Sequence, residues 1–321
     1  YLHEGRKMDA EKITPVKINE AQAINYAGQI AREMGCKVRK SKFLGGGSFG
    51  RAVKITTDSE SFVVKLLLAP GMMEKETFDL RLLAENCPVP MPQVLYKRAS
   101  SPDIPVDGYA MSLIPGKSAI LSPCLYLSGK AGRTSFADEV TSALHALHTC
   151  TNGKFGDTMA PDSSSWTELY KPFALDILKK TDKAVENGEL SAEILRAAQA
   201  AWEKFDDIFF EEPSRACLIH GDLNTANIMV QSGRVSGFID PLNSMFADPE
   251  YDLFQFDNLT GKRFFLSDTY IKKYGASKNV RVKLAFYGLF NEIYCYFKAG
   301  TLIPFIMNPL VKNMHEQLEK L

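Results

Sequence analysis

The chain has 321 residues, of which 45% are apolar and 24% are charged, values typical of a folded globular protein. This length is too great for one small module and predicts either two domains or one large two-lobed domain. The 38 basic residues balance 38 acidic ones, so the sequence lacks the overall positive charge that attracts nucleic acids or acidic membranes. No stretch approaches the roughly 18 apolar residues of a membrane span. The sequence therefore predicts neither a nucleic-acid partner nor membrane insertion.

The six cysteines lie far apart, with no C-x-x-C pair and no accompanying histidine cluster. This spacing indicates neither a zinc site nor a disulfide framework, and inert thiols in a reducing compartment are the simplest interpretation. The first seven residues carry charges but no apolar segment follows them, which argues against a secretory signal. We therefore expect a cytoplasmic protein, with an N-terminal extension over residues 1–16.

Hydrophobic periodicity and turn residues divide the first 115 residues into short elements. Apolar residues at helical spacing predict a helix over residues 19–34 and another over residues 74–86. Runs of β-branched and apolar residues predict five strands, the first three in an antiparallel meander. These strands cover residues 37–44, 51–57, 61–68, 93–96 and 109–113. Residues 17–115 are therefore expected to form a small sheet with flanking helices.

Residues 116–321 show a mostly helical periodicity. The predicted helices cover residues 135–149, 166–187, 191–210 and several segments from residue 267 onward. One β-rich interruption covers residues 216–230 and 235–239. The charge-dense run 203–212 falls on a predicted helix, where we expect it to be the solvated face. This half is therefore expected to be a helical lobe, joined to the first by a hinge near residues 109–116.

The most informative string is a polar loop, H-G-D-L-N-T-A-N at residues 220–227, with apolar runs on both sides. It differs at one fixed position from the H-R-D-L-x-x-x-N catalytic loop of protein kinases, whose Asp is the base and whose Asn binds magnesium. Thirteen residues after Asn227, Asp240 ends an apolar run, where the second metal-binding acid of such a site belongs. Phosphoryl transfer requires Mg²⁺ against the phosphates and a carboxylate that orients the attacking hydroxyl. We therefore expect Asp222 to be the base and Asn227 and Asp240 to bind Mg²⁺.

A glycine-rich segment indicates where a nucleotide would bind. Residues 45–50, G-G-G-S-F-G, fit G-x-G-x-x-G, which alone is a weak signal shared with dinucleotide-binding folds. Strand patterns on both sides favour a hairpin that covers phosphates over a Rossmann turn, which leads into a helix. A P-loop is excluded because Arg51-Ala52 follows the last glycine. The segment therefore predicts a phosphate-covering hairpin.

Lys65 follows this hairpin in an apolar strand, the context of the kinase lysine that contacts the α and β phosphates. Glu76, on the next predicted helix, is our first choice for the acid that orients Lys65, and Glu74 is the alternative. The residues assigned to the ATP site are Gly45, Gly47, Ser48, Phe49, Gly50, Lys65, Glu76, Met111 and Leu113.

These motifs together resemble the aminoglycoside phosphotransferase and choline kinase superfamily, which includes fructosamine kinases. The resemblance includes I-D at residues 239–240, D-P-E-Y-D-L at 248–253 and L-H-A-L-H at 144–148, and it covers roughly residues 40–255. It implies an α+β, bilobal, protein-kinase-like fold with an antiparallel sheet lobe and a mainly helical lobe. It also implies ATP in the cleft between the lobes and phosphorylation of a hydroxyl on a small-molecule acceptor.

Two departures from protein kinases argue against a protein substrate. Gly221 stands where many protein kinases have the Arg that pairs with a phosphorylated activation loop. Only seven residues separate Asp240 from Asp248, too few for the activation segment that supports a peptide. A nucleotide-binding pseudokinase or scaffold is a further alternative. Such a protein would be expected to lack the lysine, the base or a metal ligand, and all of these are present.

Other conspicuous residues are expected to be structural. His220 would brace the catalytic loop, and Asp248 and Asp252 would hold the loop after Asp240. The six aromatic residues between 286 and 297 recur near helical spacing and predict core packing more than an acceptor cage. Residues 241–321 hold ten basic and eight acidic residues, a balance that does not favour a polycationic aminoglycoside. Neutral or anionic sugars, amino sugars, fructosamine-like adducts and choline-like alcohols stay open as acceptors.

Overall fold

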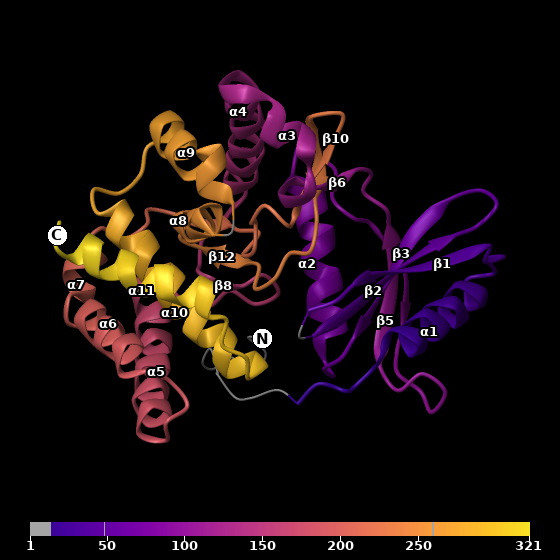
Figure 1. Ribbon diagram of the computed structural model, residues 1–321, viewed down its shortest axis with the longest axis horizontal. Coiled ribbons are helices and arrows are strands. Elements are labelled where there is room, and N and C mark those ends of the chain that lie inside the picture. Colours follow the sequence, from indigo (N-terminus) through magenta and orange to yellow (C-terminus); the bar gives the residue numbers. More distant parts are fainter. Residues whose placement is uncertain (1–13, 48, 259) are drawn as a thin grey trace.

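A computed structural model describes residues 14–47, 49–258 and 260–321 (Figure 1). Ser48 and most of the expected N-terminal extension lie outside these residues. Figure 1 shows a lobe built on a β-sheet beside a larger lobe of helices. The bilobal α+β fold expected from the sequence is therefore confirmed.

The N-terminal lobe is a five-stranded antiparallel sheet in the order β1-β2-β3-β5-β4. Two helices flank it, and the first begins with a capping box in which Asn19 and Gln22 bond each other's backbone. The elements are α1 (Glu20–Glu33), β1 (Lys40–Gly45), β2 (Gly50–Thr56), β3 (Ser61–Leu67), α2 (Met72–Asn86), β4 (Val94–Arg98) and β5 (Asp107–Ser112).

The two faces of this sheet pack against different helices because side chains alternate along a strand. Val64 and Leu66 of β3 join Ile30 of α1 in one apolar cluster. Leu67 and Tyr109 pack on the opposite face, with the apolar residues of α2. Lys65 shares that second face, so the alternation of β3 directs it toward α2 and the helical lobe.

The C-terminal lobe consists mainly of helices, with two small sheets of short strands. Its elements, with η for 3₁₀-helices, are β6 (Lys117–Ser118), η1 (Ala119–Leu121), α3 (Pro123–Leu127), α4 (Gly129–His148), β7 (Thr151–Asn152), β8 (Gly156–Asp157), α5 (Trp166–Glu186), α6 (Ala192–Glu203), α7 (Phe205–Ile208), β9 (Ala216–Leu218), β10 (Ile228–Gln231), β11 (Arg234–Phe238), β12 (Met245–Ala247), α8 (Glu250–Leu253), η2 (Phe254–Asp257), η3 (Gly261–Phe264), α9 (Leu266–Tyr274), α10 (Val280–Ala299) and α11 (Pro304–Leu318).

Aromatic side chains fill the core of this lobe around α10. Phe286, Tyr287 and Phe290 are fully buried, as the spacing of the aromatic run predicts. Trp166 of α5 donates its indole N–H to the Tyr287 hydroxyl, at 2.7 Å, so the polar atoms of both rings are paired inside the core. The described residues include no helix that is long and apolar enough to cross a membrane.

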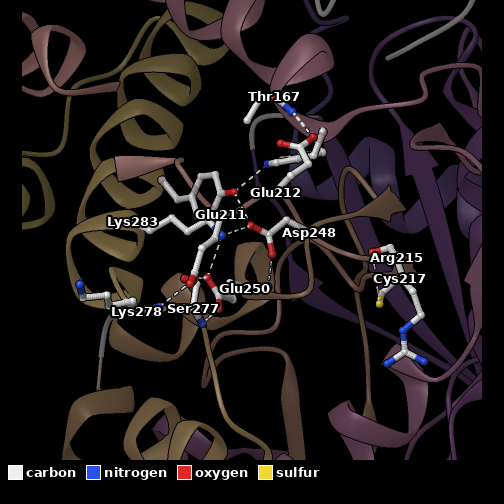
Figure 2. Close-up of polar contacts among 12 residues, drawn as sticks. Thr167, Glu211, Glu212, Arg215, Cys217, Asp248, Glu250, Ser277, Lys278 and Lys283 are labelled. Carbon is white, nitrogen blue, oxygen red and sulfur yellow. Dashed lines mark hydrogen bonds and ion pairs between the residues drawn. The ribbon is translucent and has the colours of Figure 1, made fainter. Parts of the chain in front are cut away.

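The helix expected over residues 191–210 is shorter in the structure. It ends at Glu203, and after Lys204 the short helix α7 follows, in which Phe205 packs against Phe286. Glu211 and Glu212 lie in the loop that follows, and they accept hydrogen bonds from the backbone N–H groups of Lys278 (2.8 Å) and Thr167 (3.0 Å) (Figure 2). Both acids are exposed, as expected, but they lie beyond the helices, so only the expectation that this end of the run is helical is wrong.

Candidate active site

The polar loop 219–227 lies between β9 and β10, two short strands of different sheets. It presents Asp222 as a half-buried side chain. The amide of Asn224 donates to Asp222 Oδ1 at 2.9 Å, and the amide of Asn227 donates to Oδ2 at 3.0 Å and to the Asp222 carbonyl at 2.8 Å. Two side-chain amides therefore hold the carboxylate in one orientation.

The electrostatic surroundings of Asp222 favour its protonated form. Burial raises its pKa to about 8, and the nearby carboxylate of Asp240 adds to the shift. The hydrogen bonds from Asn224 and Asn227 oppose it, because they stabilise the charged form. A carboxyl group whose pKa lies near neutrality has the property expected of a general base.

Asp252 holds the backbone of this loop. Its two carboxylate oxygens accept the N–H groups of His220 (2.8 Å) and Gly221 (2.7 Å). His148 of α4 contacts the same carboxylate at 3.1 Å. Asp252 therefore braces the catalytic loop, whereas the sequence assigned it to the loop after Asp240; the two segments lie close only in the folded chain.

The remaining structural assignments also depend on the fold. The backbone N–H of Asp222 donates to His220 Nδ1 at 3.3 Å, a contact that braces the loop. Asp248 contacts Tyr287 at 2.7 Å and Lys283 at 2.7 Å, deep in the helical core. It therefore anchors the start of α8 to α10. Gly221 has φ of +81°, and a Cβ there would collide with the Leu242 carbonyl, so a side chain at this position would displace the loop.

Lys65 bridges two acids from different lobes. Its ammonium contacts Glu76 of α2 and lies 2.6 Å from Asp240 Oδ1. Tyr109 of β5 donates its hydroxyl to Glu76 at 3.0 Å. Burial alone would lower the pKa of Lys65, but Glu76, Tyr109 and Asp240 together hold it well above its usual value. Lys65 is therefore a buried, charged lysine.

Glu74, the alternative partner, faces away from Lys65. It pairs with Lys97 at 2.7 Å on the protein surface. Residues two apart on an α-helix project about 200° apart, so only one of Glu74 and Glu76 can reach β3. The structure brings Glu76 to Lys65.

The glycine-rich segment connects β1 and β2 as a hairpin. Gly45 has φ of +126°, a conformation that glycine adopts readily. The Arg51 guanidinium bonds the carbonyls of Gly47 (2.7 Å) and Gly50 (2.8 Å) and so fixes the hairpin's second half. Phe49 packs under it, against the cluster shared by the sheet and α2.

The other residues assigned to the nucleotide lie beside this hairpin or along the neighbouring strands. A Cβ at Gly50 would lie 3.1 Å from the Lys65 side chain, so the hairpin passes directly over the lysine. Met111 of β5 pairs with Val63 of β3, two residues from Lys65. Leu113 follows the end of β5 and is half-buried.

Asn227 and Asp240 fit a magnesium site by their chemistry. The amide nitrogen of Asn227 is engaged by Asp222, which leaves its oxygen as the atom that can bind a metal. Asp240 offers its second carboxylate oxygen from a side chain that is 55% exposed. Its φ of +55° is strained for a residue with a Cβ. Oxygen ligands of this kind are those that Mg²⁺ prefers.

One region near the loop 219–227 was missed by the sequence reasoning. Burial raises the pKa of the Cys295 thiol to about 12, with contributions from Glu292 and Asp222, so this part of α10 lies near Asp222. Burial also raises the pKa of Glu292. The helical periodicity of α10 indicated only core packing, and no local signal marks which of its turns faces Asp222.

A cavity of about 730 Å³ opens in the helical lobe, and none of the described residues that line it belongs to the loop 219–227. One of its lining residues, Thr260, has its hydroxyl 3.0 Å from that of Thr225. Helices α10 and α11 supply most of its apolar lining, and four charged residues, one of them on α10, also line it. The charged residues are Asp257, Lys262, Asp268 and Arg281.

Comparisons with known proteins add the following matches. A family model described as the phosphotransferase enzyme family matches residues 40–275. No curated protein sequence matches the chain. An unliganded thermostable mutant of aminoglycoside phosphotransferase APH(4)-Ia is 16% identical, with a TM-score of 0.67 over 92% of this chain and 98% of that chain. ADP-bound APH(2'')-Ib is 19% identical, with a TM-score of 0.62 over 94% and 99%.

A ternary complex of a thermostable APH(4)-Ia mutant with AMP-PNP and hygromycin B is also similar. It is 17% identical, with a TM-score of 0.65 over 91% of this chain and 97% of that chain. These three structures share the fold described above along nearly the whole chain.

Proposed function

Because the chain belongs to the phosphotransferase enzyme family, we propose that it transfers the γ-phosphate of ATP to a hydroxyl group of a small molecule. The observation that carries this proposal is the cluster in which Lys65 bridges Glu76 and Asp240 while Asp222 lies beside Asp240. It combines a cation for phosphates, a carboxylate for a metal and a carboxylate for a proton. In-line phosphoryl transfer needs these three groups.

ATP would lie under the hairpin that contains Gly45, Gly47, Phe49 and Gly50. Lys65 would contact its phosphates, with Glu76 holding the ammonium in place. Met111 and Leu113 would contact the adenine ring near the hinge. Two of the similar structures were solved with ADP and AMP-PNP, which supports a nucleotide in this cleft. Hairpin backbone N–H groups would supply further hydrogen bonds to the phosphates.

Asn227 and Asp240 would hold Mg²⁺, which when bound neutralises charge on the phosphates. Asp222 would accept the hydroxyl proton of the acceptor as the acceptor oxygen bonds the γ-phosphorus and ADP leaves. The amides of Asn224 and Asn227 would keep the Asp222 carboxylate aimed at that hydroxyl. Lys65 remains charged throughout because its pKa is far above neutrality.

A candidate acceptor site is the cavity lined by Thr260, whose hydroxyl contacts that of Thr225 in the loop that carries Asp222. Two acidic and two basic side chains are among its lining residues, so the cavity does not select a polycation by charge alone. The APH(4)-Ia complex contains hygromycin B, and a similar APH(2'')-IIa structure contains gentamicin. Aminoglycosides therefore belong in a test panel together with sugars, amino sugars, glycated amines and choline.

The test is a nucleotide-consumption screen of this panel with the wild-type protein and the Asp222→Ala variant. We expect one acceptor class to stimulate ADP release, and Asp222→Ala to lower that rate by roughly 10² to 10⁴ while Mg–ATP still binds. Asp58→Asn, a change at an exposed acid on the sheet lobe, is the control and should keep full activity.

Three outcomes would contradict the proposal. Full turnover by Asp222→Ala would exclude Asp222 as the base. If Mg–ATP neither raised the melting temperature nor was consumed with any acceptor, the protein would be a pseudokinase or scaffold. Transfer of labelled γ-phosphate to proteins, and not to small molecules, would identify a protein kinase.

A further inference from the structure

A buried polar cluster centred on Lys75 joins α2 to the helical lobe. The Lys75 ammonium donates to Asp79 on the same helix, to the Thr158 hydroxyl at 3.0 Å and to the Ser244 carbonyl at 2.8 Å. Asp157 lies 3.7 Å from the same ammonium. Figure 1 shows α2 standing between the sheet and the helices, where such a contact can span both lobes.

Every hydrogen of the Lys75 ammonium has an acceptor in this cluster. The Thr158 hydroxyl accepts from Lys75 and donates to Asp79, which closes a ring of hydrogen bonds. The Lys75 side chain is only 14% exposed and that of Asp79 only 7%. The Lys75 cluster is therefore a preformed contact and not an incidental surface ion pair.

The Lys75 cluster connects directly to the candidate active site. Lys75 precedes Glu76, the partner of Lys65. Ser244 lies four residues after Asp240, and its hydroxyl donates to the His220 carbonyl at 2.9 Å, two residues before Asp222. One lysine therefore ties the helix that carries Glu76 to both the Asp240 loop and the catalytic loop.

Apolar packing also restrains α2, but less specifically. Met72, Met73 and Leu80 of α2 pack against the sheet through contacts that are not directional. Hydrogen bonds to fixed acceptors are directional and set the rotation. The rotation matters because it decides which side chain of α2 faces Lys65.

We propose that Lys75 is a positioning residue, whose buried ammonium sets the rotation of α2 so that Glu76, Lys65 and Asp240 stay arranged for binding nucleotide phosphates. The inference rests on the proposed phosphoryl transfer. It supplies a constitutive anchor for this helix in a chain whose segment between Asp240 and Asp248 has no room for a phosphorylated switch.

Stability alone does not account for the cluster. Replacing a buried ion pair by apolar residues of similar volume is often neutral or stabilising, whereas removing one partner is destabilising. The single variant Lys75→Met leaves Asp79 without its counter-charge. The double variant Lys75→Met/Asp79→Leu removes both charges of the close pair and the bond to the Ser244 carbonyl. Asp157, the more distant acid at 3.7 Å, keeps the Met159 backbone N–H as a partner. A comparison of the single and the double variant therefore separates an effect on stability from an effect on the position of α2.

The experiment measures the Kd of Mg–ATP by calorimetry, the melting temperature, and hydrogen exchange of the α2 amides. We expect Lys75→Met to weaken Mg–ATP binding about tenfold, as when the competent arrangement falls to about a tenth of the molecules. The double variant should recover the melting temperature but keep the weakened Kd, and α2 should exchange faster in both. The matched control is Lys97→Met, which removes the exposed pair with Glu74 on the same helix and should leave the Kd unchanged.

The proposal is overturned if Lys75→Met binds Mg–ATP within twofold of wild type, or if the double variant recovers Kd and melting temperature together. If Lys75→Met does not fold, the double variant alone decides: a wild-type Kd overturns the proposal and a weakened Kd supports it. If the wild-type protein does not bind Mg–ATP, the proposed function fails, and hydrogen exchange of α2 still tests the anchor. Unchanged exchange in the variants would then refute it.

Discussion

Lys283 offers the sharpest test of how the helical lobe holds the active-site segment. Its ammonium lies 2.7 Å from Asp248 and 2.9 Å from Glu250, at the start of α8 (Figure 2). Its side chain is 3% exposed. Burial alone would lower the pKa of Lys283, but the two carboxylates raise it, so the lysine is charged at neutral pH. The substitution Lys283→Met keeps the stem and removes the charge.

The size of the effect follows from what the two carboxylates retain. Removing one partner of a buried ion pair costs about 3–5 kcal/mol. Asp248 keeps the Tyr287 hydroxyl at 2.7 Å, and Glu250 keeps the Ser277 hydroxyl at 2.8 Å, so the lower end applies. We therefore expect a loss of about 3 kcal/mol at neutral pH. At roughly 2 °C per kcal/mol for a chain of this size, the melting temperature should fall by about 6 °C.

The assay is thermal unfolding at pH 7. Lys312→Met, which removes the exposed pair with Glu316, is the control and should shift the melting temperature by less than about 2 °C. A loss of less than about 1 kcal/mol, or a loss no larger than that of Lys312→Met, would refute the reasoning.

Three further predictions concern the proposed reaction. Glu76→Gln should weaken Mg–ATP binding roughly tenfold, because it removes the charged partner of Lys65, whereas Glu74→Gln should change the Kd less than twofold. Equal effects of the two variants in calorimetry would contradict the assignment of Glu76. The pKa of Asp222 is about 8 without a cation, and a bound cation lowers it. Because the base must be deprotonated, kcat/KM should fall as the pH drops through a value below 8; a kcat/KM that stays constant at acidic pH would exclude Asp222 as the base. Chelation of divalent cations should abolish turnover, and added Mg²⁺ should restore it; turnover that survives chelation would exclude a metal at Asn227 and Asp240.

The catalytic loop was predictable because its chemistry is local in sequence. Asp222, Asn224 and Asn227 are close along the chain, so a short loop between two strands is enough to join them by hydrogen bonds. The hairpin before Lys65 was predictable for the same reason, since glycine spacing and flanking strands are short-range signals. The two-lobed fold followed from the change of hydrophobic period near residue 116.

Several contacts depended on packing between distant segments and had no local signal. Asp252 reached the catalytic loop, 32 residues away from His220, and Lys75 reached Ser244, 169 residues away. The choice between Glu74 and Glu76 depended on the rotation of α2, which no pattern in the helix specifies. The end of α6 at Glu203 and the separate short helix α7, with its buried Phe205, had no local signal either.

The sequence by itself determined which residue types stand ready for phosphoryl transfer and in what order, because spacing within a loop or along a strand restricts which side chains can meet. Only the tertiary structure decided which acid meets Lys65 and which carboxylate braces the loop of Asp222. Those outcomes depend on the rotation and docking of whole helices. Rotation and docking are set by the sum of many buried contacts from all parts of the chain, so no single stretch of sequence specifies them.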